Sequence, residues 1–157
     1  MFPTRILLAT DGSAEAVLAE EAAVDLANGT GSELHVAYVV SKVPEIPYPT
    51  SSARKQSEEL LQRRRLGGLK LLDERVEQMT GLGGSVAASH YREGNPEKMI
   101  VWLGEEIEAG LIMTGGQRRS WFERIFGAGF SEIVSRRTDR PVLVVSRQGL
   151  RGSTVPR

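Results

Sequence analysis

The stretch Ile6-Leu7-Leu8-Ala9-Thr10-Asp11-Gly12-Ser13 decides the fold of this chain. Its unbroken apolar run favours a strand that is covered on both faces, as the strands of parallel sheets are. Asp11-Gly12 then punctuates the strand, and Ser13 is a typical N-cap for a helix that runs to about Asn28. The sequence therefore predicts a buried strand that leads at once into a helix.

The remainder of the chain repeats this alternation of strand and helix. Apolar runs predict four further strands, near 33–40, 85–91, 111–114 and 141–146, and helical patterns fill 52–80, 96–108 and the segment before residue 137. Strands separated by helices imply right-handed crossovers between parallel neighbours. We therefore expect an α/β fold, a doubly wound five-stranded parallel sheet with helices on both faces.

Length and composition exclude several classes of protein. The 157 residues fall in the size range of one domain, which we expect over residues 1–147, followed by a flexible tail over 148–157. Because 20 basic residues balance 20 acidic ones, no attraction to nucleic acid or to a membrane surface is expected. The chain has no cysteine, and neither a signal peptide nor a membrane-spanning apolar run is evident, which favours a cytoplasmic protein.

Asp11 is the first candidate for chemistry. It follows the first strand directly, so its carboxylate is expected at the carboxyl edge of the sheet, where ligands of such folds bind. A ribose hydroxyl or a cation could use it there. An ordinary turn residue beside an N-cap gives the same sequence pattern, so both interpretations stay open.

A glycine-rich loop between the fourth strand and the last helix is the second candidate. It contains Gly115-Gly116-Gln117-Arg118-Arg119 and, just before the helix, Gly127-Ala128-Gly129-Phe130-Ser131. Glycine lets backbone amides approach phosphate oxygens closely, and arginine side chains can neutralise an anion. A helix-capping loop with solvated arginines is the alternative interpretation.

The signatures of several enzyme classes are missing. The sequence has no GxxxxGK[ST] loop, no GxGxxG fingerprint after the first strand and no GxSxG elbow, which disfavours P-loop hydrolysis, nicotinamide chemistry and nucleophile-elbow hydrolysis. His35 and His90 lie in strand patterns without the spacing of metal ligands, so we interpret both as structural. The Arg63-Arg64-Arg65 run, with glutamates on either side, is typical of a solvated helix face.

Three motifs together resemble the universal stress protein (UspA-like) family: Ile6 to Ser13, Gly94-Asn95-Pro96, and Leu111 to Val145. Their order and spacing carry the resemblance, which spans residues 3–147. It implies a Rossmann-like sheet with strand order 3-2-1-4-5. Members that bind ATP or AMP share a late G-x2-G-x9-G-[ST] loop, and this chain keeps one of its four signature positions. Those positions are occupied here by Gly115, Arg118, Ala128 and Gly129.

The resemblance implies two alternative functions. In the first, a stress-response module binds ATP or AMP, with Mg²⁺ accompanying ATP. Its nucleotide-binding residues would be Thr10, Asp11, Val39, Gly115, Gly116, Arg118, Gly129, Phe130 and Ser131. In the second, an interaction protein with a degenerate phosphate loop binds no nucleotide and recruits a protein partner. Both alternatives are homodimers through the last strand. We find no convincing catalytic residue besides Asp11, so at most weak ATP hydrolysis is expected.

Overall fold

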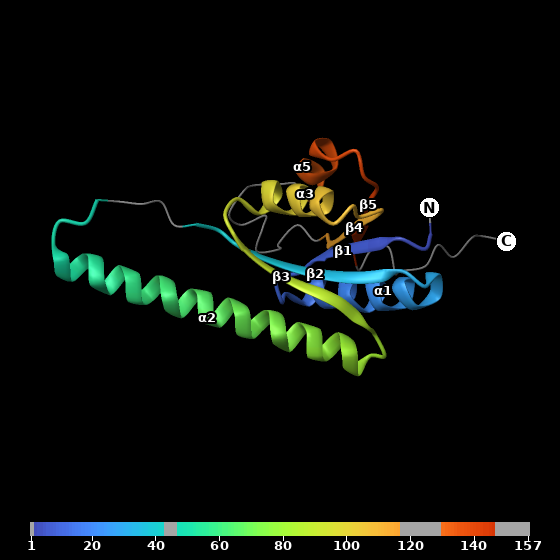
Figure 1. Cartoon of the computed structure of the whole chain (residues 1–157), viewed down its shortest axis with the longest axis horizontal. Coiled ribbons are helices and arrows are strands. Elements are labelled where there is room, and N and C mark those ends of the chain that lie inside the picture. Colours follow the sequence, from blue (N-terminus) through green and yellow to red (C-terminus); the bar gives the residue numbers. More distant parts are fainter. Residues whose placement is uncertain (1, 43–46, 117–129, 147–157) are drawn as a thin grey trace.

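The computed structural model describes residues 2–42, 47–116 and 130–146, and its five strands form one parallel sheet (Figure 1). The strands are β1 (Arg5–Ala9), β2 (Glu33–Val40), β3 (Val86–Glu93), β4 (Leu111–Gly115) and β5 (Val142–Val145). Their order across the sheet is β3-β2-β1-β4-β5, which confirms the predicted doubly wound topology. The tail predicted over 148–157 lies outside the described residues.

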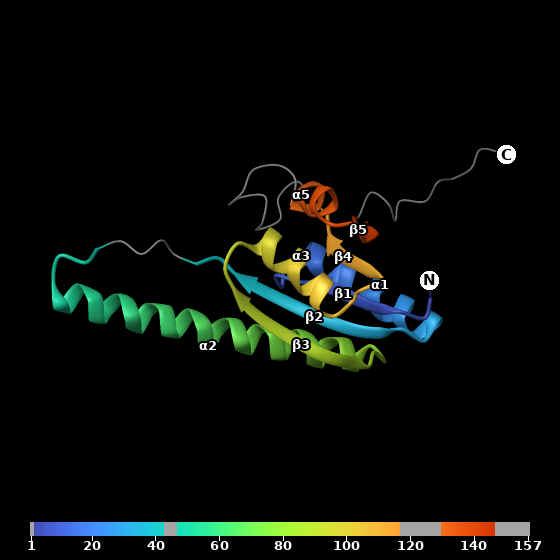
Figure 2. The same cartoon turned by 45° about the horizontal axis from the view of Figure 1, so that its top comes forward.

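Helices cover both faces of the sheet, as the alternating pattern predicts. The helices that pack on it are α1 (Ala14–Thr30), α2 (Ser51–Gly81), α3 (Pro96–Glu106) and α5 (Phe130–Arg137). Figures 1 and 2 show α1 and α2 on one side of the sheet and α3 and α5 on the other. None of the described helices is long and apolar enough to cross a membrane.

The apolar residues of β1 alternate between two core layers. Ile6 and Leu8 pack with residues of α1 and α2, whereas Leu7 and Ala9 pack with residues of α3 and α5. Because successive side chains of a strand point to opposite faces, a central strand with helices on both sides must be apolar throughout. This two-sided burial explains the unbroken run at the start of the sequence.

The register of β1 determines which residues meet at the carboxyl edge of the sheet. Ala9 pairs with Ala37 of β2 on one side and with Thr114 of β4 on the other. The strand order reverses between β1 and β4, and the crevice at such a switch point is where doubly wound folds bind their ligands. The residues that follow β1 and β4 therefore lie at the candidate site.

The structure corrects one detail of the sequence analysis and adds another. Gly115 belongs to β4 as its last residue and does not open the loop. Helix α2 begins and ends close to the predicted bounds, but its N-terminal half extends beyond the sheet, so Leu60 and Leu61 are exposed (Figure 1). Only Gly68, Leu72 and Met79 of this helix are buried, because only its C-terminal half lies on the sheet.

Candidate functional site

Asp11 lies two residues beyond the end of β1, in the turn that leads into α1. One carboxylate oxygen, Oδ1, accepts a hydrogen bond from the Ser13 amide at 2.9 Å, and the Ser13 hydroxyl in turn accepts one from the Ala16 amide at 3.2 Å. Gly12, with φ +75°, adopts the left-handed conformation that this turn requires. The interpretation of Asp11 as a turn residue and Ser13 as an N-cap is therefore confirmed for these atoms.

The second oxygen of Asp11 is not explained by the turn. Oδ2 is buried and has no hydrogen-bond partner among the described residues. A buried polar atom without a partner costs roughly 1–3 kcal/mol, and a charged one costs more. The turn therefore leaves one acceptor at the switch point of the sheet available to a donor from outside the described chain.

Thr10, which precedes Asp11, is held in place by two hydrogen bonds. Its amide donates to the Ala37 carbonyl at 2.9 Å, and its buried hydroxyl donates to Glu20 Oε1 at 2.8 Å. The hydroxyl proton of Thr10 is thus engaged inside the protein. Thr10 acts by fixing the end of β1, and through it the position of Asp11.

Glu20, which the sequence analysis missed, is a buried acid beneath the site. It is 1% exposed, it accepts the bond from Thr10, and its Oε1 lies 3.6 Å from Nε of Arg75 on α2. Burial raises the pKa of the Glu20 carboxyl, the Thr10 hydrogen bond and Arg75 oppose this rise, and the charge of Asp11 adds to it. The sequence did hold a signal, because Glu20 stands among the buried alanines of α1.

Gly115 and Gly116 are required by packing. A Cβ atom on Gly115 would lie 2.8 Å from the backbone oxygen of Glu15, so the end of β4 rests against the first turn of α1. A Cβ on Gly116 would overlap the Val144 side chain, and the Gly116 amide donates to the Val145 carbonyl at 2.9 Å. Both glycines bring β4 close to its neighbours beside Asp11.

The end of β2 lies beside β1 on the side opposite to β4. The Val39 side chain is 1% exposed and packs in the core, so only its backbone is available to a ligand. Ser41, which the sequence analysis did not single out, has a buried hydroxyl without a described partner. Its position directly after a strand was the available signal.

The remaining predicted residues fall on the connection between β4 and α5 or on the first turn of α5. Phe130 is buried at the start of α5, and the Ser131 backbone lies in the same first turn. Arg118 and Gly129, like Ala128, lie outside the described residues. Within the described ranges, no group of three or more His, Asp or Glu side chains is arranged to hold a metal ion.

The fold and the position of Asp11 define a small α/β protein that has a doubly wound parallel sheet and a carboxylate at the switch point of the sheet. The chain belongs to the universal stress protein family, which it matches over residues 3–146. This match confirms the family that the three sequence motifs predict.

Three similar proteins illustrate the relationship. Universal stress protein MJ0531 of Methanocaldococcus jannaschii is 29% identical over 143 residues, which cover 91% of this chain and 82% of that protein. A universal stress protein solved in complex with cAMP is 20% identical, with a TM-score of 0.65 and coverage of 93% of this chain and 98% of the other. The universal stress protein from Archaeoglobus fulgidus in complex with dAMP is 18% identical, with a TM-score of 0.60 and coverage of 92% and 99%. Both structures support the fold.

Proposed function

We propose that this universal stress protein binds an adenine nucleotide, ATP or AMP, at the carboxyl ends of β1, β2 and β4. The observation that carries the proposal is the buried, unpaired Oδ2 of Asp11. A ribose hydroxyl is a neutral donor of the right kind for this oxygen, because it supplies the missing hydrogen bond without adding a second negative charge. The backbone of Val39 lies on the same side, where it can contact the base.

Charge decides which way the nucleotide would lie. Phosphate oxygens are repelled by the Asp11 carboxylate, so the phosphates would extend away from it, toward Gly115 and Gly116 and the connection that follows. The sequence of that connection contains Arg118, Arg119, Arg124 and Gly129, and Ser131 follows in the first turn of α5. Backbone amides and arginines are the groups that bind phosphates in proteins. Mg²⁺ would accompany ATP through its phosphates.

Two relatives in this fold support the choice of ligand. One universal stress protein has been solved in complex with cAMP and another in complex with dAMP, and both ligands carry adenine and a phosphate group. The proposal transfers the class of ligand to this chain, with Asp11 as its ribose contact. It assigns binding alone, because Asp11 is the one carboxylate proposed here and it contacts the sugar.

The experiment compares thermal unfolding and calorimetric titration with AMP, ATP and ATP plus Mg²⁺ for the natural chain and for Asp11→Asn. Asn keeps the Oδ1 acceptor of the turn and replaces Oδ2 by an NH2 group, so the turn is preserved while the charged acceptor for a ribose hydroxyl is lost. A ligand at 100 times its Kd stabilises the folded state by about 2.7 kcal/mol. We expect a rise in Tm for the natural chain and at least a tenfold weaker affinity for the variant.

Asp25→Asn is the matched control, since Asp25 is an exposed residue of α1 with the same charge. It should bind nucleotide as the natural chain does. If the natural chain shows neither a rise in Tm nor heat of binding at millimolar nucleotide, the alternative function holds: an interaction protein that binds no nucleotide. If both variants bind equally well, Asp11 is not the ribose contact.

The same proposal includes a homodimer formed through β5. This strand occupies one edge of the sheet, and its Leu143 and Val144 side chains are 42% and 43% exposed. An apolar edge strand has unpaired backbone groups and invites pairing with another strand. A second copy related by a two-fold axis would place its own β5 alongside and cover both sets of side chains.

A further inference from the structure

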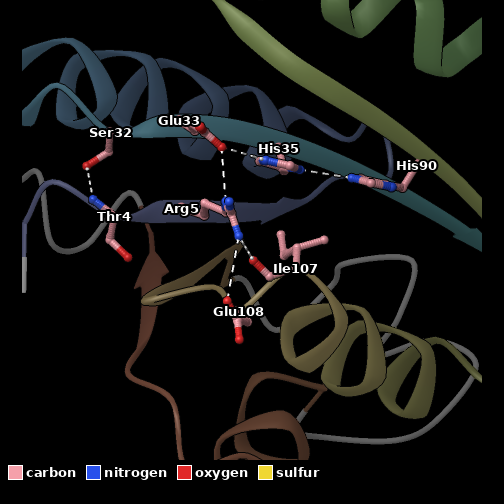
Figure 3. Close-up of polar contacts among 8 residues, drawn as sticks. All are labelled: Thr4, Arg5, Ser32, Glu33, His35, His90, Ile107 and Glu108. Atoms are coloured by element: carbon pink, nitrogen blue, oxygen red, sulfur yellow. Dashed lines mark hydrogen bonds and ion pairs between the residues drawn. The ribbon is translucent and has the colours of Figure 1, made fainter.

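The structure brings His35 and His90 together, although 55 residues separate them in the sequence (Figure 3). His35 lies on β2 and His90 on β3, at diagonal positions, because His35 pairs in register with Ala88 and Ala37 with His90. Nδ1 of His35 is 3.0 Å from Nε2 of His90, and the two ring planes differ by 8°. The rings therefore meet edge to edge, and one proton lies between two nitrogen atoms.

Glu33 determines which nitrogen carries the proton. Its Oε2 lies 3.4 Å from Nε2 of His35 and 3.1 Å from Nε of Arg5 on β1 (Figure 3). The hydrogen bond from His35 and the Arg5 guanidinium hold the pKa of the Glu33 carboxyl below its usual range, so it is an anion at neutral pH. A carboxylate only accepts, so His35 carries its proton on Nε2. His35 Nδ1 is then an acceptor, and His90 must donate from Nε2.

Other charged residues, on β1, on β3, on α3 and in the turn after α3, lie near Glu33, His35 and His90. Arg5 also donates to the Ile107 carbonyl at 3.0 Å and lies 3.9 Å from Glu108, both in the turn after α3. On β3, Arg92 lies 3.7 Å from Glu106 of α3. Burial lowers the pKa of the His90 imidazolium, and the charges of His35 and Arg92 lower it further, whereas Glu106 opposes them.

We propose that Glu33, His35 and His90 form a proton-sensitive clasp between β2 and the edge strand β3, which holds with one added proton and opens with two. The first proton enters at Nδ1 of His90, which has no hydrogen-bond partner in the described ranges. The Nε2 proton of His90 then passes to Nδ1 of His35, so the N–H···N bond reverses and the charge rests on His35 beside Glu33.

The second proton breaks the clasp. It can enter only at Nε2 of His90, which is by then the acceptor, so both facing nitrogen atoms carry protons and no lone pair remains between them. Two imidazolium ions 3.0 Å apart also repel each other. Among the described strands β3 pairs with β2 alone, and it also packs against α2, so loss of the clasp should loosen this edge of the sheet.

The test is a histidine titration of the natural chain by ¹⁵N NMR, which reports the protonation of each ring nitrogen. At pH 8 we expect protons on Nε2 of both rings. As the pH falls, the first step should move the His90 proton from Nε2 to Nδ1, and the second step should follow at least one pH unit lower. A His35 ring protonated on Nδ1 at pH 8, or two independent titrations at the same pH, would overturn the proposal.

Three variants separate charge from geometry. In His35→Gln the remaining His90 should titrate in one step without the change of tautomer, and in His90→Gln the same holds for His35. Glu33→Gln keeps an amide oxygen that accepts from Nε2 of His35, so it should retain the tautomer but move the first step to lower pH. A first step unchanged in Glu33→Gln contradicts the role of the carboxylate.

Hydrogen exchange measures the consequence for the fold. After correction for intrinsic exchange rates, the opening constants of β3 amides should rise about tenfold across the second titration step, the factor given by one pKa unit of coupling. The His35→Gln chain should show no such step. If β3 protection in the natural chain is independent of pH across the second step, the pair is a structural contact and not a clasp.

Discussion

At the scale of single residues, the buried acid Glu20 lies next to the candidate site and contacts one neutral residue, Thr10, and one cationic residue, Arg75. Thr10 donates to Glu20 at 2.8 Å and Arg75 lies 3.6 Å away, yet Arg75 Nε itself has no hydrogen bond among the described residues. The Glu20 charge is therefore only partly compensated, and desolvation is the largest influence on its pKa. This residue links the fold of α1 and α2 to the position of Asp11.

Replacement of Glu20 by Gln should change the pH dependence of stability in a defined direction. The pKa of Glu20 is raised above its ordinary 4.5 in the folded state, so the folded state binds the proton more tightly than the unfolded state. The stability that Glu20 contributes is therefore full below pH 4.5 and is lost as the pH rises through the folded pKa, by at most about 1.4 kcal/mol per pH unit. Urea unfolding of the natural chain and Glu20→Gln at several pH values between 4 and 8 measures this difference.

The exposed neighbour Glu21 provides the control for that measurement. Glu21→Gln removes the same charge from the same helix without touching Thr10 or Arg75, so its stability relative to the natural chain should vary much less with pH. The natural chain should lose stability relative to Glu20→Gln as the pH rises. If its stability relative to this variant stays constant or increases instead, burial does not raise the pKa of the Glu20 carboxyl.

Sequence patterns located the site but not its chemistry at this scale. Asp11 was predictable, because a polar residue directly after an apolar strand must lie at the carboxyl edge of a parallel sheet. The engagement of the Thr10 hydroxyl was not, since its partner Glu20 lies ten residues away and Arg75 lies on another helix. Likewise His35 and His90 were correctly assigned to strands, but their contact depends on the register between β2 and β3, which periodicity does not encode.

At the scale of elements, α2 shows what a helical pattern does and does not determine. Apolar periodicity predicted a helix over 52–80, and the helix spans Ser51–Gly81 with Thr50 as N-cap. How much of it lies on the sheet depends on the length of β2 and β3, so the exposure of Leu60, at 59%, was not predictable. Where the helix does meet the sheet, Gly68 faces the rings of Tyr38 and Tyr91.

The adjacent glycines of α2 allow a direct test of that contact. A Cβ on Gly68 would lie 2.7 Å from Cε2 of Tyr91 and 3.1 Å from Cε1 of Tyr38, whereas nothing lies within 4 Å of a Cβ on Gly67. Gly67→Ala should stabilise the protein by about 0.5–1 kcal/mol through helix propensity, and Gly68→Ala should destabilise it by about 1–3 kcal/mol through overpacking. Denaturant unfolding of the two variants checks this, and equal effects would show that α2 does not pack as closely as described.

At the scale of the whole molecule, the two edges of the sheet differ in how they are covered. Strand β3 lies under α2 and is tied to α3 by Arg92 and Glu106, whereas β5 has two side chains more than two-fifths exposed. The sequence predicted the topology of the sheet from alternation and resemblance together. An edge is identified only when the strand order is known, since Val142 to Val145 form an apolar run like those of the central strands.

The last prediction concerns this uncovered edge. If β5 pairs two subunits, Leu143→Arg should place a charge in the interface. The natural chain should then be a dimer and the variant a monomer, because a desolvated unpaired charge costs several kcal/mol. Light scattering coupled to size exclusion measures the mass, and Leu60→Arg is the control, since Leu60 is at least as exposed but lies on α2. A natural chain that is monomeric at all concentrations contradicts the homodimer. A dimer that Leu60→Arg dissociates and Leu143→Arg leaves intact would move the interface to the projecting half of α2, where Leu61 and Leu66 are also exposed.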